Sequence, residues 1–409
     1  MNPELLKIAW RNLWRNRRRS LITLASIYFS VFFAVTMRGY HLGMWKNLLD
    51  GVLHSYTGYL QIHATGYWEN KTLDYTFSWD DSLNRSILAN KDINGLIPRL
   101  ESFGLASSGE KTKAVLVAGI QPELEIPFTR LDEKIRKGRL IDTDDPGVVL
   151  SERLSVFLGL KPGDTLTLIS QGYQGVSAQG LYPVRGIVKL PAPEWDNMMV
   201  YMTLENAQIF YSAEGQISSL VVDIPPDSKI EKLARHLRTE LNQQQYEVMS
   251  WKEMLVELFQ QWQADNAGMI LILALLYLII GFGIFGTVMM MINERQREFG
   301  IMVAVGMKPA KLSFVVSTEM ILLSSLGVFA GMISSIPLVY FLYLHPFNIT
   351  GETAKVFAQY GMEPVIQVRW HWKYILNQGL AVYLVTLLAA IYPVYSIIRI
   401  KLIKALRGI

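Results

Sequence analysis

Four long stretches of the chain contain no charged residue, and segments of ordinary polarity separate them. They cover residues 20–37, 267–292, 320–344 and 374–398. At about 1.5 Å per residue, each is long enough to approach or cross a hydrocarbon layer of roughly 30 Å. The first is the shortest, and its helix can continue past Arg38, whose side chain can reach the interface. The pattern predicts one membrane span near the N-terminus and three near the C-terminus.

The segment between the first two spans has the pattern of a water-soluble domain with a core. Residues 147–169 contain a strand, a short helix, a Lys-Pro-Gly-Asp turn and a second strand. Further alternating strands are predicted at 58–63, 113–120, 182–188 and 198–202, and further helices at 204–211 and 229–244. The sequence therefore predicts a large α+β domain at residues 46–265.

Two helices are predicted at the edges of these parts. Residues 4–19 place Leu6, Trp10 and Trp14 on one face and arginines on the other, which is typical of a helix that lies in the headgroup region. Residues 251–265 place Leu255, Leu258 and Trp262 at helical spacing. We expect this second helix to run without interruption into the second span, so that it can transmit motion between the domain and the membrane.

Composition and charge fix the expected topology. The chain has 409 residues, 51% hydrophobic and 18% charged, which is too apolar for an ordinary soluble protein. Its net charge of +4 does not indicate nucleic acid, because the basic residues flank the spans. These residues are Lys7, Arg11, Arg15, Arg17, Arg18, Arg19, Arg295, Arg297, Lys308, Lys311, Arg399, Lys401, Lys404 and Arg407. The positive-inside rule places all three groups, and both termini, in the cytoplasm.

The predicted division of the chain follows. It comprises a cytoplasmic amphipathic helix (1–19), a first span (20–45), a periplasmic α+β domain (46–265), a second span (266–292), a cytoplasmic element (293–312), a third span (313–344), a periplasmic loop (345–373), a fourth span (374–398) and a cytoplasmic tail (399–409). No small-residue cleavage pattern follows the first span, so we expect a retained anchor and not a cleaved signal peptide.

Chemistry-bearing motifs do not indicate an enzyme. The chain has no cysteine, which excludes a thiol nucleophile and cysteine-based metal sites. It has no phosphate-binding Gly-x-x-x-x-Gly-Lys loop and no His-Glu-x-x-His, and its six histidines are scattered. We expect no cofactor in this chain; any energy must come from a partner subunit.

The cytoplasmic element at 293–312 is the most distinctive segment. Its first part carries the charged residues Glu294, Arg295, Arg297 and Glu298. The apolar run from Phe299 to Val305 includes Gly300 and is followed by Gly306. We expect residues 293–298 to continue the second-span helix and the apolar run to form a short helix. Exposure of this run would be unfavourable by several kcal/mol at about 25 cal/mol per Å². One face of the element is therefore predicted to lie in a groove of a soluble partner, with these four charged residues at the rim. The alternative is a solvated loop with a buried apolar segment.

Small residues and one acid lie inside the spans. Gly281, Gly283 and Gly286 in the second span and Gly327 and Gly331 in the third permit close helix packing. The spacing leaves open whether they pack within one subunit or between two. The acid is Glu319, which we expect to form a hydrogen bond or an ion pair with a basic residue at the cytoplasmic face. A role in substrate or proton handling is the alternative.

Several of these segments resemble one family of membrane proteins. The run from Asn293 to Met307 is similar to the "ER-x-RE-x-G" hallmark of permeases of the FtsX/MacB superfamily, and most closely of its lipoprotein-releasing LolC/LolE type. The other similar segments are 9–20, 58–67, 158–164, 392–395 and 404–407, together with the acid at Glu319. The resemblance implies an inner-membrane subunit of an ABC transporter, whose element 293–312 couples to a separate ATPase that binds ATP and Mg.

The resemblance also implies partners and leaves the cargo open. We expect two ATPase subunits, a second permease copy or a sister permease, and a lipoprotein or amphiphilic substrate. A periplasmic carrier or adaptor is an additional candidate partner. Residues 170–182 are short, polar and Gly-rich, unlike the hook by which one lipoprotein-releasing permease recruits its carrier. The alternatives are a scaffold that activates a periplasmic cell-wall hydrolase and the permease of a peptide or drug efflux pump.

Overall fold

The structure is a computed structural model, and it describes residues 3–15, 17–225, 229–352, 354 and 365–399. The chain divides into two compact units. One is helical and comprises Met1–Lys46, Trp262–Asn348 and Val365–Ile409; the other is an α+β unit of Asn47–Gln261 and Ile349–Pro364. Most of the predicted tail at 399–409, with Lys401, Lys404 and Arg407, lies outside the described residues.

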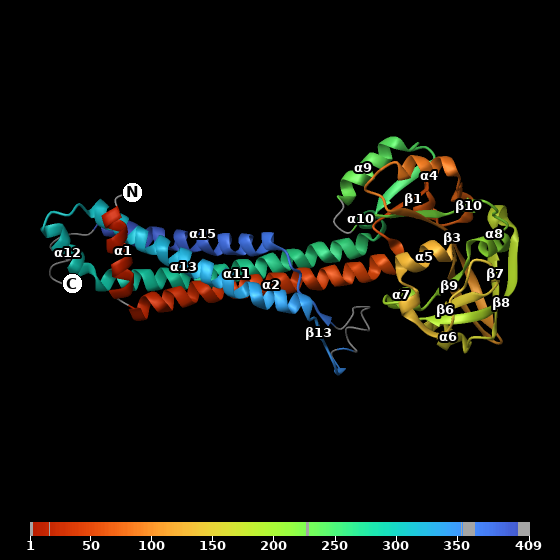
Figure 1. Cartoon of the computed structure of the whole chain (residues 1–409), viewed down its shortest axis with the longest axis horizontal. Coiled ribbons are helices and arrows are strands. Elements are labelled where there is room, and N and C mark those ends of the chain that lie inside the picture. The colour runs from red at the N-terminus through yellow and green to blue at the C-terminus, as the bar shows by residue number, and fades with distance from the viewer. Residues whose placement is uncertain (1–2, 16, 226–228, 353, 355–364, 400–409) are drawn as a thin grey trace. The chain divides into compact units, whose positions relative to one another are not determined.

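Long helices dominate the helical unit (Figure 1). They are α2 (Arg17–Val52), α11 (Val256–Glu294), α13 (Pro309–Leu344) and α15 (Trp372–Ile398), with the shorter α1 (Pro3–Arg15) and α12 (Gln296–Ala304). Among the described residues, four helices are long and apolar enough to cross a membrane, and they contain the four predicted spans. The predicted fold class, one span followed by a domain and three spans, is confirmed.

Several helix boundaries differ from the prediction. The three arginines that we grouped with the amphipathic helix, Arg17 to Arg19, belong to α2, because α1 ends at Arg15. The helix expected to run without interruption from Trp251 is broken at Leu255, with φ −113° and ψ 59°. A capping box between Ser250 and Glu253 starts the separate one-turn helix α10 (Trp251–Met254), whose Trp251 and Met254 are buried. The uninterrupted helix starts only at Val256.

Close packing joins the first and third spans within the subunit. A Cβ added at Gly327 would lie 2.7 Å from the Ile27 side chain, and one at Gly331 would lie 2.8 Å from the Tyr28 carbonyl oxygen. Both glycines therefore allow α13 to approach α2 more closely than any side chain would permit. Ile27 and Val31, which these two glycines meet, are fully buried.

A ten-stranded mixed sheet forms the centre of the α+β unit. Its order is β12-β1-β11-β3-β4-β9-β6-β8-β5, and β7 pairs with β3 and β8. The strands are β1 (Leu60–Ala64), β3 (Gly95–Ser108), β4 (Lys111–Ile120), β5 (Ile135–Gly138), β6 (Val148–Ser151), β7 (Thr165–Gln171), β8 (Ser177–Val188), β9 (Met199–Thr203), β11 (Ser219–Asp223) and β12 (Tyr246–Ser250). The pairs β4–β9 and β6–β8 are parallel, and the other pairs are antiparallel.

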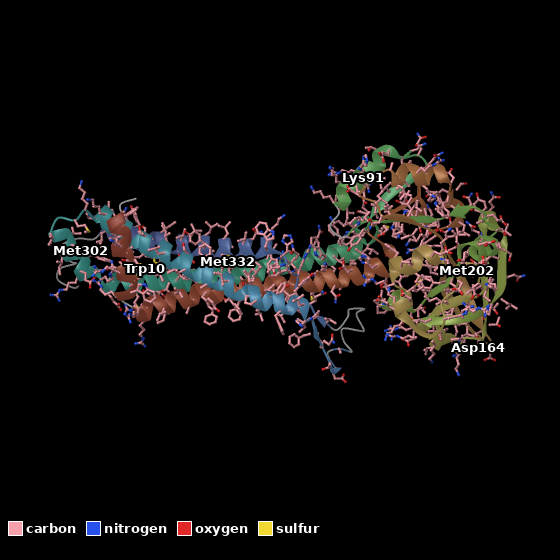
Figure 2. All side chains as sticks on the ribbon, viewed as in Figure 1. Trp10, Lys91, Asp164, Met202, Met302 and Met332 are labelled. Carbon is pink, nitrogen blue, oxygen red and sulfur yellow. The ribbon has the colours of Figure 1, made fainter. Side chains whose placement is uncertain are left out.

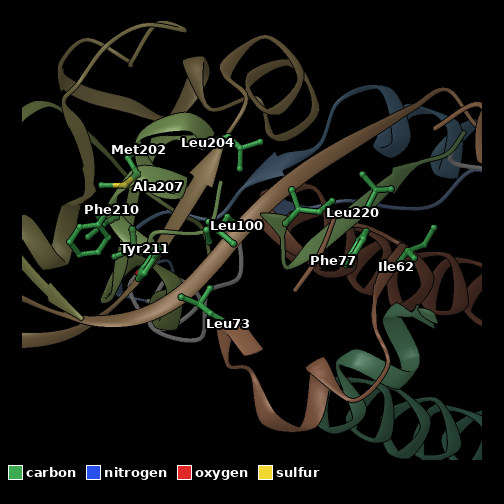
Figure 3. Packing of buried hydrophobic residues seen from close by; sticks show 14 of the residues in the cluster. Ile62, Leu73, Phe77, Leu100, Met202, Leu204, Ala207, Phe210, Tyr211 and Leu220 are labelled. Carbon is green, nitrogen blue, oxygen red and sulfur yellow. The ribbon is translucent and has the colours of Figure 1, made fainter. Parts of the chain in front are cut away.

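Helices cover this sheet and complete its core. They include α3 (Tyr67–Asn70), α5 (Pro122–Thr129), α6 (Glu152–Leu158), α7 (Pro193–Asp196), α8 (Leu204–Tyr211) and α9 (Ile230–Glu240). Figure 3 shows how Leu204, Ala207 and Phe210 from α8 lie near Leu100 and Met202 from the strands. The strands predicted at 58–63, 113–120, 182–188 and 198–202 correspond to β1, β4, β8 and β9, and the strand, helix and strand predicted at 147–169 correspond to β6, α6 and β7. Helix α8 matches its predicted range, whereas the helix predicted at 229–244 ends at Glu240.

The longest strand, β3, was not predicted. Its sequence contains Pro98 and Gly104, which are disfavoured inside strands, and the charged residues Arg99 and Glu101. The sheet tolerates the two charged residues because the buried Arg99 pairs with Glu125 and lies 3.7 Å from Glu101. A pattern of apolar alternation cannot detect a strand whose buried residues are charged.

Candidate functional site

The segment between the second and third spans is the candidate site. The second-span helix ends at Glu294, Arg295 has φ −94° and ψ 2°, and α12 begins at Gln296. Residues 296–298 therefore start a new helix and do not continue α11 as we predicted. After α12, Gly306 takes φ +103°, a conformation that side chains rarely adopt, and Pro309 opens α13 at its first turn.

Arg295 is buried, which contradicts its predicted place at an exposed rim. Its side chain is only 8% exposed, and its NH1 donates a hydrogen bond of 2.9 Å to Oε2 of Glu319. Its guanidinium also lies 5.1 Å from the centre of the Phe299 ring. The ion pair expected for Glu319 thus comes from the candidate site itself, because a carboxylate in an apolar span is stable only with a charged partner nearby.

Phe299 faces inward as well. It is fully buried and packs in one cluster with Leu13, Ile292, Leu312 and Val316, and Gly300 is also buried. The prediction that Phe299 contributes to an exposed apolar face is wrong, because half of the apolar run is needed to hold α12 on the helical unit. The face left to solvent includes Ile301 (50% exposed), Ala304 and Val305 (84% exposed). Arg297 and Glu298 are exposed beside it.

Helix α1 fastens this element, which the sequence did not reveal. Asn12 Nδ2 donates a hydrogen bond of 2.7 Å to Oε1 of Glu319, and Arg15 pairs with Glu298. Arg19, at the start of α2, pairs with Glu294. Figure 2 shows Trp10 of α1 and Met302 of α12 toward the same end of the helical unit. The only sequence signal was the basic face of α1, which is equally typical of a helix on a lipid surface.

The glycines of the second span differ from those of the third. A Cβ at Gly281 would lie 3.3 Å from the Val385 side chain, a tight contact that Val385 would have to relieve by a small shift. Gly283 and Gly286 would meet no described atom within 4 Å. The structure therefore accounts for Gly327 and Gly331 by packing within the subunit, whereas Gly283 and Gly286 lie on a face that the subunit's described residues do not cover.

Comparison with known proteins agrees with this architecture. The family model for the MacB-like periplasmic core domain matches residues 20–240, and the model for the FtsX-like permease C-terminal matches residues 270–402. The chain belongs to the FtsX-like ABC permeases that carry a MacB-like periplasmic core domain. It is thus a multi-pass protein of the bacterial inner membrane.

Individual relatives are distant but match over long regions. This permease is 22% identical over 426 aligned residues to a "Lipoprotein-releasing system transmembrane protein LolC" from Xylella fastidiosa, which covers 99% of both chains. It is 21% identical to the LolE protein of Haemophilus influenzae over 73% of each chain. The periplasmic region of MacB from Actinobacillus actinomycetemcomitans aligns with 50% of this chain and 93% of its own, at 18% identity and a TM-score of 0.35.

Proposed function

We propose that this permease is the membrane subunit of a transporter in which two separate ATPase subunits drive release or export of a lipoprotein or amphiphile on the periplasmic side. ATP and Mg bind to the ATPases. A second copy of the chain, or a sister permease, completes the membrane part, and both termini lie in the cytoplasm. The full-length similarity to lipoprotein-releasing proteins supports the choice of substrate.

The observation that carries the coupling role is the divided surface of α12. One side is anchored in the helical unit through Phe299 and the buried Arg295–Glu319 pair. The other side presents Ile301 and Val305 to solvent beside Arg297 and Glu298. An apolar pair with charged residues at its edge is the composition of a protein-binding surface. Because the anchored side is rigidly attached, force applied to the exposed side is passed to α11 and α13.

The mechanism follows from this attachment. Closure of the ATPases on ATP displaces α12, and α11, which is one unbroken helix from Val256 to Glu294, carries the displacement toward the periplasmic domain. The domain then shifts a substrate that is already in the outer leaflet. No passage of substrate through the membrane is required.

The test is a charge on the exposed face. We expect Val305→Asp to weaken ATPase binding and its stimulation at least tenfold, because the desolvated contact would bury an unpaired carboxylate. The matched control is Val156→Asp, since Val156 is 74% exposed on the α+β unit. Co-purification with the ATPase and ATP hydrolysis in proteoliposomes are the readouts. Full binding and stimulation by the Val305 variant would refute the coupling role.

A further inference from the structure

The α+β unit contains a cavity that the coupling proposal does not use. Its volume is about 640 Å³, within the range of about 300–1,000 Å³ that is typical of small-molecule sites. Five aromatic side chains line it: Tyr56, Tyr67, Trp68, Phe103 and Trp195. Apolar residues, some of them at the start of α11, and several polar residues also line it. The cavity is therefore an amphiphilic site and not a gap between apolar residues.

Three buried charged residues, Arg99, Glu101 and Glu125, lie at or behind the cavity wall. Arg99 is fully buried and binds Glu125 with two hydrogen bonds, from Nε at 2.8 Å and from NH2 at 2.7 Å. Its third nitrogen, NH1, donates to the Tyr56 carbonyl oxygen at 2.5 Å. Glu101 lies farther away, 3.7 Å from NH1, and accepts a hydrogen bond from the Tyr56 hydroxyl. Arg99 is thus committed to Glu125, and Glu101 is the surplus acid.

Glu101 faces the cavity, whereas Arg99 and Glu125 do not line it. Burial raises the pKa of the Glu101 carboxyl, even though the Arg99 charge acts in the opposite direction. An ionised Glu101 in this position has no charged hydrogen-bond donor, because the Arg99 hydrogen bonds go to Glu125 and to the Tyr56 carbonyl oxygen. A positively charged ligand in the cavity would supply such a donor.

The other charged residues that line the cavity are also mostly acidic. Glu194 and Glu257 line the cavity with Glu101, and Lys71 is the one basic residue among the lining residues. Lys71 itself shows that a cation is stable here, because its Nζ lies 4.2 Å from the centre of the Trp68 ring. Aromatic faces and carboxylates together are the features that bind organic ammonium groups. A purely hydrocarbon ligand would instead desolvate Glu101 without compensation.

We propose that this cavity binds an amphiphilic organic cation, with its ammonium group at Glu101 and its apolar body against the aromatic wall. The proposal goes beyond ATPase coupling and does not depend on it, because binding can be measured on the permease alone. If the cavity does not bind amines, the coupling role of α12 is unaffected. If α12 does not couple to the ATPase, the cavity proposal is likewise unaffected.

The first experiment compares ligand charge. The full chain is placed in zwitterionic phosphatidylcholine nanodiscs, and binding of 4-phenylbutylamine, 4-phenylbutanol and 4-phenylbutanoate is measured by calorimetry against empty nanodiscs. We expect the amine to bind about tenfold or more tightly than the other two, a difference of about 1.4 kcal/mol. Equal affinities, or tighter binding of the carboxylate, would overturn the proposal.

The second experiment uses substitutions of opposite sign. We expect Glu101→Gln to weaken amine binding about tenfold and Lys71→Gln to strengthen it, because Lys71 repels the ligand. Lys71 is exposed, so its substitution does not threaten folding. If Glu101→Gln does not fold, Lys71→Gln and Lys71→Glu still test the site, because both should strengthen amine binding. Weaker amine binding by both Lys71 variants would refute the site.

The third measurement is pH dependence. The groups that face Glu101 are Arg99, Glu125, Lys71, Tyr56, Tyr67 and Tyr201. Of these and Glu101, the carboxyl of Glu101 is the group whose raised pKa moves its titration toward neutral pH. Amine affinity is expected to rise with pH as Glu101 ionises and then to level off. The Glu101→Gln variant should lack this rise; an unchanged pH profile in that variant would contradict the role of Glu101.

Discussion

Single residues show how the α12 element is held. Arg295 forms an ion pair with the Glu319 carboxylate inside a membrane span, and its guanidinium lies over the Phe299 ring. It therefore does not contribute to the exposed surface of the element. Glu319 is 1% exposed and has two partners, Arg295 and Asn12, which come from segments far apart in the chain. One buried acid of α13 thus contacts both α1 and the residue that precedes α12.

Removing Arg295 alone should therefore lower the stability of the helical unit much more than removing Arg295 and Glu319 together. We expect Arg295→Met to destabilise the helical unit by about 3–5 kcal/mol, because it leaves Glu319 buried without its charged partner. The double variant Arg295→Met with Glu319→Leu should recover most of that loss. Unfolding in detergent, followed by circular dichroism, measures both. A double variant as unstable as Arg295→Met would show that the pair is not coupled.

Stability of the α+β unit should depend on pH through His63. This side chain is fully buried, and its Nε2 is 2.7 Å from Oε1 of Gln61. Burial, assisted by the Lys71 charge, lowers the pKa of His63 to about 3. The unfolded chain, with a pKa of about 6.5, then binds more protons between these two values. Stability is fully present above the unfolded pKa and is lost as pH falls from about 6.5 toward 3.

The expected slope for this one group is about 1.4 kcal/mol per pH unit inside that window. Chemical unfolding at several pH values, followed by tryptophan fluorescence, measures it. The control is His63→Gln, which keeps polarity without titrating. It should flatten the dependence by this amount, and an identical slope in both proteins would count against a neutral buried His63.

At the scale of helices, close contacts between backbones determine which spans pack together, and small residues make these contacts possible. Helix α13 meets α2 at Gly327 and Gly331, where the backbones approach too closely for a side chain. Sequence spacing identified these positions as packing residues but could not say which helix lies opposite. The first span, more than 280 residues earlier in the chain, is the partner.

Alanine substitution should lower stability at the third-span glycines but not at the exposed second-span glycines. We expect Gly331→Ala to destabilise the helical unit by about 1–3 kcal/mol, because the added methyl would lie 2.8 Å from the Tyr28 carbonyl oxygen. Gly283→Ala, with open space around it, is the matched control and should leave monomer stability unchanged. Denaturation and native mass of both variants are the readouts. A lower native mass with Gly283→Ala would assign that glycine to a contact between two subunits.

The whole molecule depends on one continuous helix. Helix α11 spans 39 residues from Val256 to Glu294, so it belongs to both compact units of the chain. A helix transmits displacement only while its hydrogen-bond ladder is unbroken. If the proposed mechanism is correct, a break near the membrane edge should separate ATP hydrolysis from the work done on the substrate.

We expect Ala267→Pro to abolish release of a lipoprotein substrate while ATP hydrolysis by the assembled complex continues. Ala267 is exposed, so the change acts mainly on the backbone. Ala267→Ser is the control and should behave like the unmodified chain. Both activities are measured in the same proteoliposomes. Release that continues at the normal rate with proline present would refute transmission through α11.

Sequence by itself determined the features that depend on local chemistry. Uncharged stretches long enough for a membrane, basic residues at their ends and period-two strands each produce a pattern within one segment, because bilayer thickness and backbone geometry act locally. Only the tertiary structure decided which charges are exposed. Arg295 and Arg297 are two residues apart, yet one is buried on Glu319 and the other faces solvent. The β3 strand and the cavity beside Glu101 were missed for the same reason: their buried charges are stable only through partners that are distant in sequence.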